Sequence, residues 1–408
     1  MRTLYTDKFK TGCFSINFLR PHCSQTAALD ALLPSVLLRA TEKYPDIRSI
    51  SMHLDELYGA TFDTLVRKKG EAKLVGFYAD FIEDRFLPEG EAVFQPMVEF
   101  AKEVLLRPYA ENGCFCERFV EGEKLNLINA IESSLNDKRS YAVKQMLKTM
   151  CAEEAYGVPR LGYAEDVKRI TPQSLWAHYS EVLKTSRVEI FYAGRQTAQT
   201  VAEAFAPLFC GERTQFVQTD TKIVAEASEV KEISEAMAVT QGKLVMGLRT
   251  GITCEDEDYP ELMLLNAVYG SGVTSKLFVN VREKLSVCYY ASSSIDKYKG
   301  IMVISSGIAF ENYELARNAI LQELEACKCG EITETELETA RRQVLSSLKM
   351  AMDAPARLDD FYIGMAVARS CDIPQLMKQL ASVTVEDLSA AARKLSLDTV
   401  YFLKGEEQ

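Results

Sequence analysis

The sequence predicts an α+β protein made of two similar domains, each a sheet with several helices. Two observations support this prediction. Short motifs recur at a nearly constant offset, and apolar periodicity gives both halves the same order of strands and helices. The chain has 408 residues and is 47% hydrophobic, which suits two globular domains and excludes a largely disordered chain.

The internal repeat is carried by three matches. Thr171 opens one predicted helix and Thr384 opens another, 213 residues later (384 minus 171). Ser133-Ser134-Leu135 recurs at the same offset as Ser346-Ser347-Leu348, and the strands after the two helices end at Gly194 and Gly405, 211 residues apart (405 minus 194). Each match is weak alone, but together they indicate a duplicated unit.

Each half begins with a strand and continues with an amphipathic helix. In the first helix, apolar residues follow the helical period at Leu29, Leu32, Leu33, Val36 and Leu37; in the second they do so at Leu262, Leu265, Val268 and Tyr269. Strands are predicted at 13–19, 188–194, 242–248, 289–294, 300–308 and 400–405, and long charged helices near 117–135 and 333–352. Each half is therefore an α+β unit.

A polar stretch separates the two halves. The predicted organisation is an N-terminal domain over 1–210, a linker over 211–235 and a C-terminal domain over 236–408. No low-complexity tract interrupts this order.

Charge and composition exclude several function classes. The net charge is −11, which argues against a nucleic-acid binder, because phosphate affinity needs clustered Lys and Arg. We find no signal-peptide pattern in 1–20 and no apolar run near the ~20 residues that cross a bilayer. The 11 scattered cysteines favour reduced thiols. We therefore expect a cytoplasmic protein that does not bind a membrane.

The second half resembles a known family. The run Leu265-Asn266-Ala267-Val268-Tyr269-Gly270-Ser271-Gly272, followed by Thr274–Phe278, Val281–Leu285 and Tyr289-Tyr290, is similar to the second-domain signature of the insulinase/pitrilysin zinc metallopeptidases, which include processing-peptidase-like members. The resemblance extends over essentially the whole chain. It implies two α+β domains, each a mixed, mostly antiparallel sheet with flanking helices. These two domains would pair with two more, from a fused half or a second subunit, around a chamber in which a peptide is cleaved.

The resemblance also implies where a zinc motif H-x-x-E-H would lie. Its two histidines bind zinc from one face of a helix, and its Glu takes a proton from the zinc-bound water. Residues 36–45 resemble the segment that follows the motif in active members. Counting back from them places the first His at Ala31, the Glu at Pro34 and the second His at Ser35. None of the three can replace the original side chain.

The more distant ligand is missing as well. Active members carry a Glu seven residues before the ligand Glu; here Glu123 keeps the first carboxylate, and Ala130 stands at the ligand position. A second test needs no alignment. The three histidines, His22, His53 and His178, are too far apart in sequence for either H-x-x-E-H or the reversed H-E-x-x-H. We therefore expect no metal in this chain.

The opposite half of the catalytic centre is retained. Active members place an Arg and, seven residues later, a Tyr in the last domain, where they hold the substrate backbone and stabilise the oxyanion. Arg282 and Tyr289 stand at that spacing. The alternative is that Arg282 pairs with a carboxylate such as Glu283 and that Tyr289 is an ordinary strand aromatic.

These features predict a non-catalytic subunit that supplies Arg282 and Tyr289 in trans. The expected partner is a homologous subunit that bears the zinc in a heterodimer, with a homodimer as a further possibility, and the substrate is a peptide. Two other functions stay open. The chain could be a stand-alone peptidase with an atypical metal site, or a non-enzymatic scaffold or peptide-binding protein.

Overall fold

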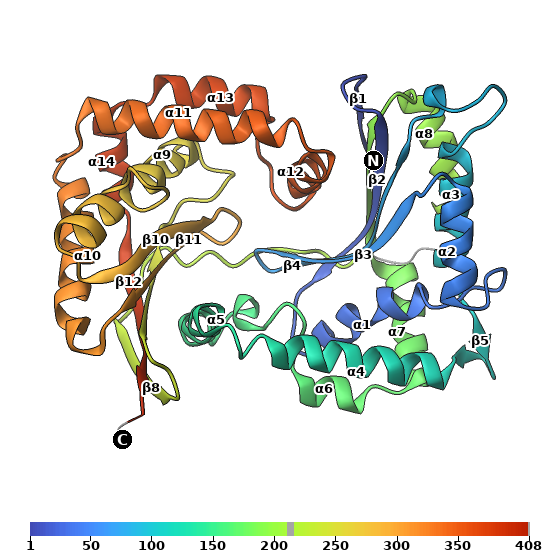
Figure 1. Cartoon of the computed structure of the whole chain (residues 1–408), viewed down its shortest axis with the longest axis horizontal. Helices are drawn as coiled ribbons and strands as arrows, with labels where there is room; N and C mark the ends of the chain where they lie inside the picture. The colour runs from blue at the N-terminus through green and yellow to red at the C-terminus, as the bar shows by residue number, and fades with distance from the viewer. Residues whose placement is uncertain (210–215, 407–408) are drawn as a thin grey trace. The chain divides into compact units, whose positions relative to one another are not determined.

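The structure is a computed structural model that describes residues 1–209 and 216–406. Residues 211–215, where the predicted linker begins, lie outside the described residues. The chain divides into two compact units (Figure 1). The first contains Met1–Glu132, Val158–Asp220 and Ala354–Val367; the second contains Ser133–Gly157, Thr221–Asp353 and the segment from Ala368 onward.

The first unit contains a five-stranded sheet in the order β1-β7-β2-β4-β3. Its strands are β1 (Arg2–Tyr5), β2 (Thr11–Pro21), β3 (Thr61–Lys69), β4 (Ala72–Ile82) and β7 (Arg187–Gly194), with a small hairpin of β5 (Ala110–Glu111) and β6 (Cys114–Phe115). Its helices are α1 (Ala27–Leu37), α2 (Ile47–Glu56), α3 (Phe94–Leu106), α4 (Glu117–Ser133), α6 (Ala164–Arg169), α7 (Pro172–Thr185), α8 (Ala198–Phe205) and α12 (Pro355–Val367), with short turns η1 (Asp84–Phe86) and η3 (Ala206–Phe209).

The second unit contains a five-stranded sheet in the order β10-β11-β9-β12-β8. Its strands are β8 (Lys231–Met237), β9 (Gly242–Arg249), β10 (Cys288–Asp296), β11 (Ile301–Ile308) and β12 (Ser396–Gly405). Its helices are α5 (Lys138–Met150), α9 (Tyr259–Tyr269), α10 (Tyr313–Lys328), α11 (Glu334–Ala351), α13 (Ile373–Ser382) and α14 (Val385–Arg393), with η2 (Ala155–Gly157), η4 (Leu277–Lys284) and η5 (Phe310–Asn312).

The two sheets follow one plan. In each, an edge strand runs parallel to its neighbour, β1 to β7 and β8 to β12, and the other pairs are antiparallel. The predicted α+β class with two mixed, mostly antiparallel sheets is confirmed. Strand β8 begins at Lys231, so the last part of the predicted linker, 231–235, lies in the second sheet.

The repeated motifs have the same structural role in two of the three cases. Thr171 and Thr384 are the N-cap residues of α7 and α14, and each forms a capping box with the residue three positions later. Gly194 and Gly405 end β7 and β12. The serine pairs differ, because Ser133 ends α4 whereas Ser346 lies inside α11.

Each unit takes one helix from the other half of the sequence. α5 packs on β9, β12 and β11, and α12 packs on β7 and β2. Both helices have 13 residues. Apolar side chains of α5 meet the second sheet closely enough that a Cβ on Gly247 would lie 2.5 Å from the sulfurs of Met146 and Met150. A larger residue at this crossing would require these methionine side chains to move.

Buried ion pairs hold the exchanged segments. In the second unit, Arg249 reaches Glu154 at 2.7 Å and Asp398 at 2.8 Å, and Lys299 reaches Glu154 at 2.6 Å. In the first unit, the buried carboxylate of Asp359 on α12 accepts hydrogen bonds from Ser15 and Arg67. These side chains satisfy one another in positions where an unpaired charge is costly.

Among the described residues, no helix combines the length and the apolar character needed to cross a membrane.

Replacing Glu154 by Gln is expected to lower the free energy of unfolding by about 3 kcal/mol, because it leaves Arg249 and Lys299 without their shared carboxylate. Burial raises the pKa of Glu154, but the two cations outweigh burial and hold that pKa below the ordinary 4.5. The stabilisation is therefore present above about pH 4.5 and is lost as the pH falls through the lower folded-state pKa. Urea unfolding at several pH values measures both effects.

The control for this substitution is Glu153→Gln, at an exposed neighbouring position. We expect it to leave the unfolding midpoint nearly unchanged. Equal midpoints for the two variants would contradict the proposed role of Glu154.

Candidate functional site

Helix α1 carries the three positions at which the zinc motif was expected. Ala31 and Pro34 are buried and Ser35 is partly exposed. Pro34 lies inside the helix, which continues to Leu37. Among the described residues, no group of three or more His, Cys, Asp or Glu side chains is placed to hold a metal ion. The residues present therefore do not fit a zinc ion.

Helix α4 carries the two positions of the distant ligand. Glu123 forms an ion pair with Arg39, whose Nη1 lies 3.3 Å from Oε1, and only 12% of the Glu123 side chain is exposed. Arg39 follows Ser35 by four residues, so this pair links the end of the α1 segment to α4. Ala130, at the ligand position, is exposed. Glu123 is thus engaged in an ion pair between chain segments.

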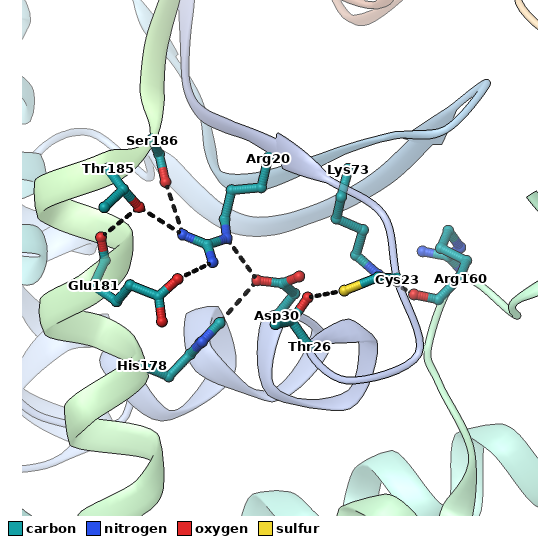
Figure 2. Close-up of polar contacts among 10 residues, drawn as sticks. All are labelled: Arg20, Cys23, Thr26, Asp30, Lys73, Arg160, His178, Glu181, Thr185 and Ser186. Atoms are coloured by element: carbon teal, nitrogen blue, oxygen red, sulfur yellow. Dashed lines mark hydrogen bonds and ion pairs between the residues drawn. The ribbon is translucent and has the colours of Figure 1, made fainter. Parts of the chain in front are cut away.

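The carboxylate that α1 does contain is directed into the core. Asp30 is fully buried and lies 2.9 Å from His178 Nε2 on α7 and 3.4 Å from Arg20 Nε on β2 (Figure 2). Arg20 also donates to Glu181 at 2.8 Å and to the hydroxyl of Ser186 at 3.3 Å. The cluster fixes α1 against β2 and α7, and its cations are paired with oxygen acceptors.

The start of α1 has polar contacts on its other side. Cys23 lies 3.3 Å from the hydroxyl of Thr26, and Lys73 on β4 donates to the backbone carbonyl of Arg160 (Figure 2). Burial lowers the pKa of Lys73 to about 8. The first contact lies within the loop before α1, and the second joins β4 to the segment before α6.

Arg282 lies near the end of η4, a π-helical segment that leads into β10. Its Nε donates to the backbone carbonyl of Tyr289 at 3.0 Å, and its guanidinium carbon lies 4.4 Å from the centre of the Phe278 ring. Nη1 is 3.6 Å from the Glu283 carboxylate, and 38% of the side chain is exposed. The guanidinium is thus anchored on one edge and by its face, and part of it is accessible to solvent.

Tyr289 lies at a β-bulge in edge strand β10. Cys288 pairs with Ile308 and Tyr290 pairs with Gly307, so Tyr289 is the additional residue between two consecutive partners. A bulge changes the direction of side chains and frees backbone groups from the ladder. Here the backbone carbonyl of Tyr289 accepts a hydrogen bond from Arg282, and 64% of the tyrosine is exposed. The structure therefore places Arg282 and Tyr289 next to each other. The Arg282 side chain is hydrogen-bonded to the Tyr289 backbone, and both side chains are accessible to solvent.

This arrangement presents two kinds of hydrogen-bond donor, a guanidinium and a phenol hydroxyl, beside the free edge of a sheet. Such donors stabilise negative charge that develops on a carbonyl oxygen. The alternative pairing of Arg282 with Glu283 is present as well, but at 3.6 Å and with the Glu283 side chain 59% exposed it is a weak surface contact.

Sequence reasoning missed three residues. Asp30 lies on α1 among the expected zinc positions, Phe278 contacts Arg282, and Arg139 contacts the tyrosine after Tyr289. Asp30 had a signal, because it shares a helical face with Leu33 and Leu37, where a carboxylate is unexpected. Phe278 precedes Arg282 by four residues, a spacing that brings side chains together on a helix. Arg139 contacts Tyr290 from α5, and no local pattern could reveal that contact.

Comparison with known proteins now defines the family. The family model described as "Peptidase M16 inactive domain" matches residues 169–344. The probable inactive metalloprotease YmfF of Bacillus subtilis is 31% identical over 403 residues, which cover 98% of this chain and 95% of that protein. The chain belongs to the M16 metallopeptidase family. The resemblance to insulinase/pitrilysin-type zinc peptidases is therefore confirmed.

Solved structures agree with the M16 fold. A conserved protein from Enterococcus faecalis V583 is 28% identical with a TM-score of 0.92, and the match covers 100% of this chain and 96% of that one. The peptidase M16 inactive domain from Pseudomonas fluorescens is 17% identical with a TM-score of 0.80, covering 99% and 95%.

The purified chain, incubated with excess zinc and desalted, is expected to carry no stoichiometric zinc in mass-spectrometric metal analysis, because the ligand positions lack donor atoms. The matched variant combines Ala31→His, Pro34→Glu, Ser35→His and Ala130→Glu, and we expect it to gain zinc. Stoichiometric zinc on the natural chain would support a stand-alone peptidase instead. A folded variant without zinc would show that these positions are assigned incorrectly.

Replacing Asp30 by Asn is expected to lower the free energy of unfolding by about 3 kcal/mol, because Arg20 and His178 lose a buried carboxylate. The matched control is Glu181→Gln, which removes the other carboxylate on Arg20. That side chain is 53% exposed, so a loss below about 1 kcal/mol is expected. Urea denaturation compares the two, and equal losses would contradict the structural role of Asp30.

Proposed function

We propose that this protein is a non-catalytic M16 subunit that completes the active site of a zinc-bearing homologue for peptide hydrolysis. Arg282 and Tyr289 are the residues it contributes. The observation that carries the proposal is their joint placement, since the bulge exposes Tyr289 and its carbonyl orients the Arg282 guanidinium.

The chain's own first half supplies no metal chemistry to that reaction. Ala31, Pro34 and Ser35 offer neither ligands nor a general base, so the hydrolytic water must be activated elsewhere. A homologous subunit with an intact H-x-x-E-H meets that need. The proposed assembly is a heterodimer, and an assembly of two copies of this chain would lack the metal.

The two retained residues have a defined chemical task in this assembly. As water attacks the peptide carbonyl, negative charge develops on its oxygen. Nε of Arg282 already donates to the Tyr289 carbonyl, so the substrate would be bound by the Nη groups, of which Nη1 must leave its weak contact with Glu283 at 3.6 Å. The Tyr289 hydroxyl adds a neutral donor next to them. Donors held in place before the reaction stabilise the transition state without reorganisation.

The described cysteines are all free thiols. Reduced cysteines are typical of the cytosol, and we propose the cytoplasm as the compartment of this assembly.

The test mixes the purified chain with an M16 homologue from the same organism that retains H-x-x-E-H, and measures hydrolysis of an internally quenched, unstructured peptide. We expect the mixture, but not either protein alone, to be active. Arg282→Ala and Tyr289→Phe should each lower kcat/KM by about 10²–10³, the range found when one oxyanion donor is removed.

Two matched controls stand in the first unit. Arg169→Ala removes an exposed arginine that faces Asp166 at 3.8 Å, and Tyr5→Phe removes the hydroxyl of a tyrosine that is 67% exposed. Neither should change the rate. Unchanged hydrolysis in the Arg282 and Tyr289 variants would refute the proposal. A stable complex without hydrolysis of any peptide would indicate a scaffold.

A further inference from the structure

Two cationic side chains converge on one aromatic ring beside the bulge. Arg139, in the first turn of α5, places its guanidinium carbon 4.3 Å from the centre of the Tyr290 ring, and Lys243 on β9 places Nζ 6.0 Å from the same centre. Arg139 donates to the Ser292 hydroxyl at 2.9 Å, and Lys243 donates to the side chain of Gln241. Among the described residues, neither cation forms a direct ion pair with a carboxylate, although the charge of Asp137 acts on both.

The sheet face beneath these cations has unused hydrogen-bonding capacity. Tyr290 lies across Gly307, where a Cβ would come within 2.4 Å of the ring. The hydroxyls of Tyr290 and Ser305 lie close to each other and form no hydrogen bond with any third described residue, although Ser305 is only 6% exposed. Ser305 pairs in register with Ser292, so both side chains lie on the same face. Each hydroxyl can therefore still form a hydrogen bond with a ligand.

The local electrostatics favour an anion at this place. Burial and the nearby charge of Arg139 lower the pKa of Lys243, and the carboxylate of Asp137 opposes them only in part. The N-terminus of α5 adds the positive end of a helix dipole. The neighbouring carboxylate of Asp137 is used to cap that helix, where it accepts hydrogen bonds from the backbone of Arg139 and Ser140 at 3.1 and 3.2 Å.

We propose that Arg139 and Lys243, beside Tyr290, form a subsite for a carboxylate of an extended peptide. The carboxylate belongs either to an acidic side chain or to the C-terminus. The subsite rests on the proposed function, because Tyr290 follows Tyr289 directly in β10. An extended chain advances about 3.3 Å per residue, so the recognised carboxylate lies within a few residues of the peptide bond that Tyr289 and Arg282 contact.

The test titrates the full chain with unstructured peptides that carry a neutral dye, and follows fluorescence anisotropy at low salt. One peptide has an internal Glu and an amidated C-terminus, the second has Gln in its place, and the third has Gln and a free C-terminal carboxylate. We expect at least one carboxylate peptide to bind about tenfold more tightly than the neutral one, as a charge-assisted hydrogen bond provides.

Arg139→Gln and Lys243→Gln are expected to abolish that preference. The matched control is Arg118→Gln, because Arg118 is also exposed and stacks on an aromatic ring, with its guanidinium carbon 5.1 Å from the centre of Phe119. The control should keep the preference. Thermal unfolding midpoints show that each variant is folded.

The pattern of binding identifies the carboxylate. A gain confined to the Glu peptide indicates an acidic side chain, and a gain confined to the free C-terminus indicates terminal recognition. Equal binding of all three peptides, no binding of any, or a preference that survives both substitutions would overturn the subsite. Because this assay contains no zinc-bearing partner, a failure of the subsite can be told apart from a failure of the proposed function in the hydrolysis assay.

Discussion

Glu154 forms ion pairs with both Arg249 and Lys299 in the interior of the second unit. This shared carboxylate holds Ser133–Gly157, a segment from the first half of the chain, on the second sheet. Asp359 has the matching role in the first unit, where its carboxylate accepts hydrogen bonds from Arg67 and Ser15. Buried charges are tolerated only when they are paired, so each exchanged segment is required by the unit that it joins. Neither half of the sequence therefore contains a complete unit of its own.

The exchange also determines which side chains surround the candidate site. Arg282 and Tyr289 come from one local stretch, and their hydrogen bond depends on the bulge in β10. Arg139 reaches the neighbouring Tyr290 only because α5 packs on the second sheet. The proposed oxyanion donors and the proposed carboxylate subsite thus have different origins in the sequence, although each includes a tyrosine of β10.

The first unit keeps the M16 scaffold without the side chains that bind its metal. Helix α1 is secured by Asp30, which pairs with Arg20 and His178, and by apolar residues packed on the sheet. A catalytic zinc site contributes chemistry through its ligands and its water, whereas the packing of the helix depends on the core. Loss of the ligands is therefore compatible with retention of the fold.

The sequence by itself determined the α+β class, the repeat and the main elements, because apolar periodicity and the capping threonines Thr171 and Thr384 are local signals. It also placed Arg282 and Tyr289 seven residues apart and showed that no histidine pair could form the zinc motif. Only the tertiary structure decided that α5 and α12 are exchanged, that Tyr289 occupies a bulge, and that Asp30 is buried beside His178. These features depend on contacts between residues far apart in the chain, and local pattern carries no information about which distant side chain completes an ion pair or a strand register.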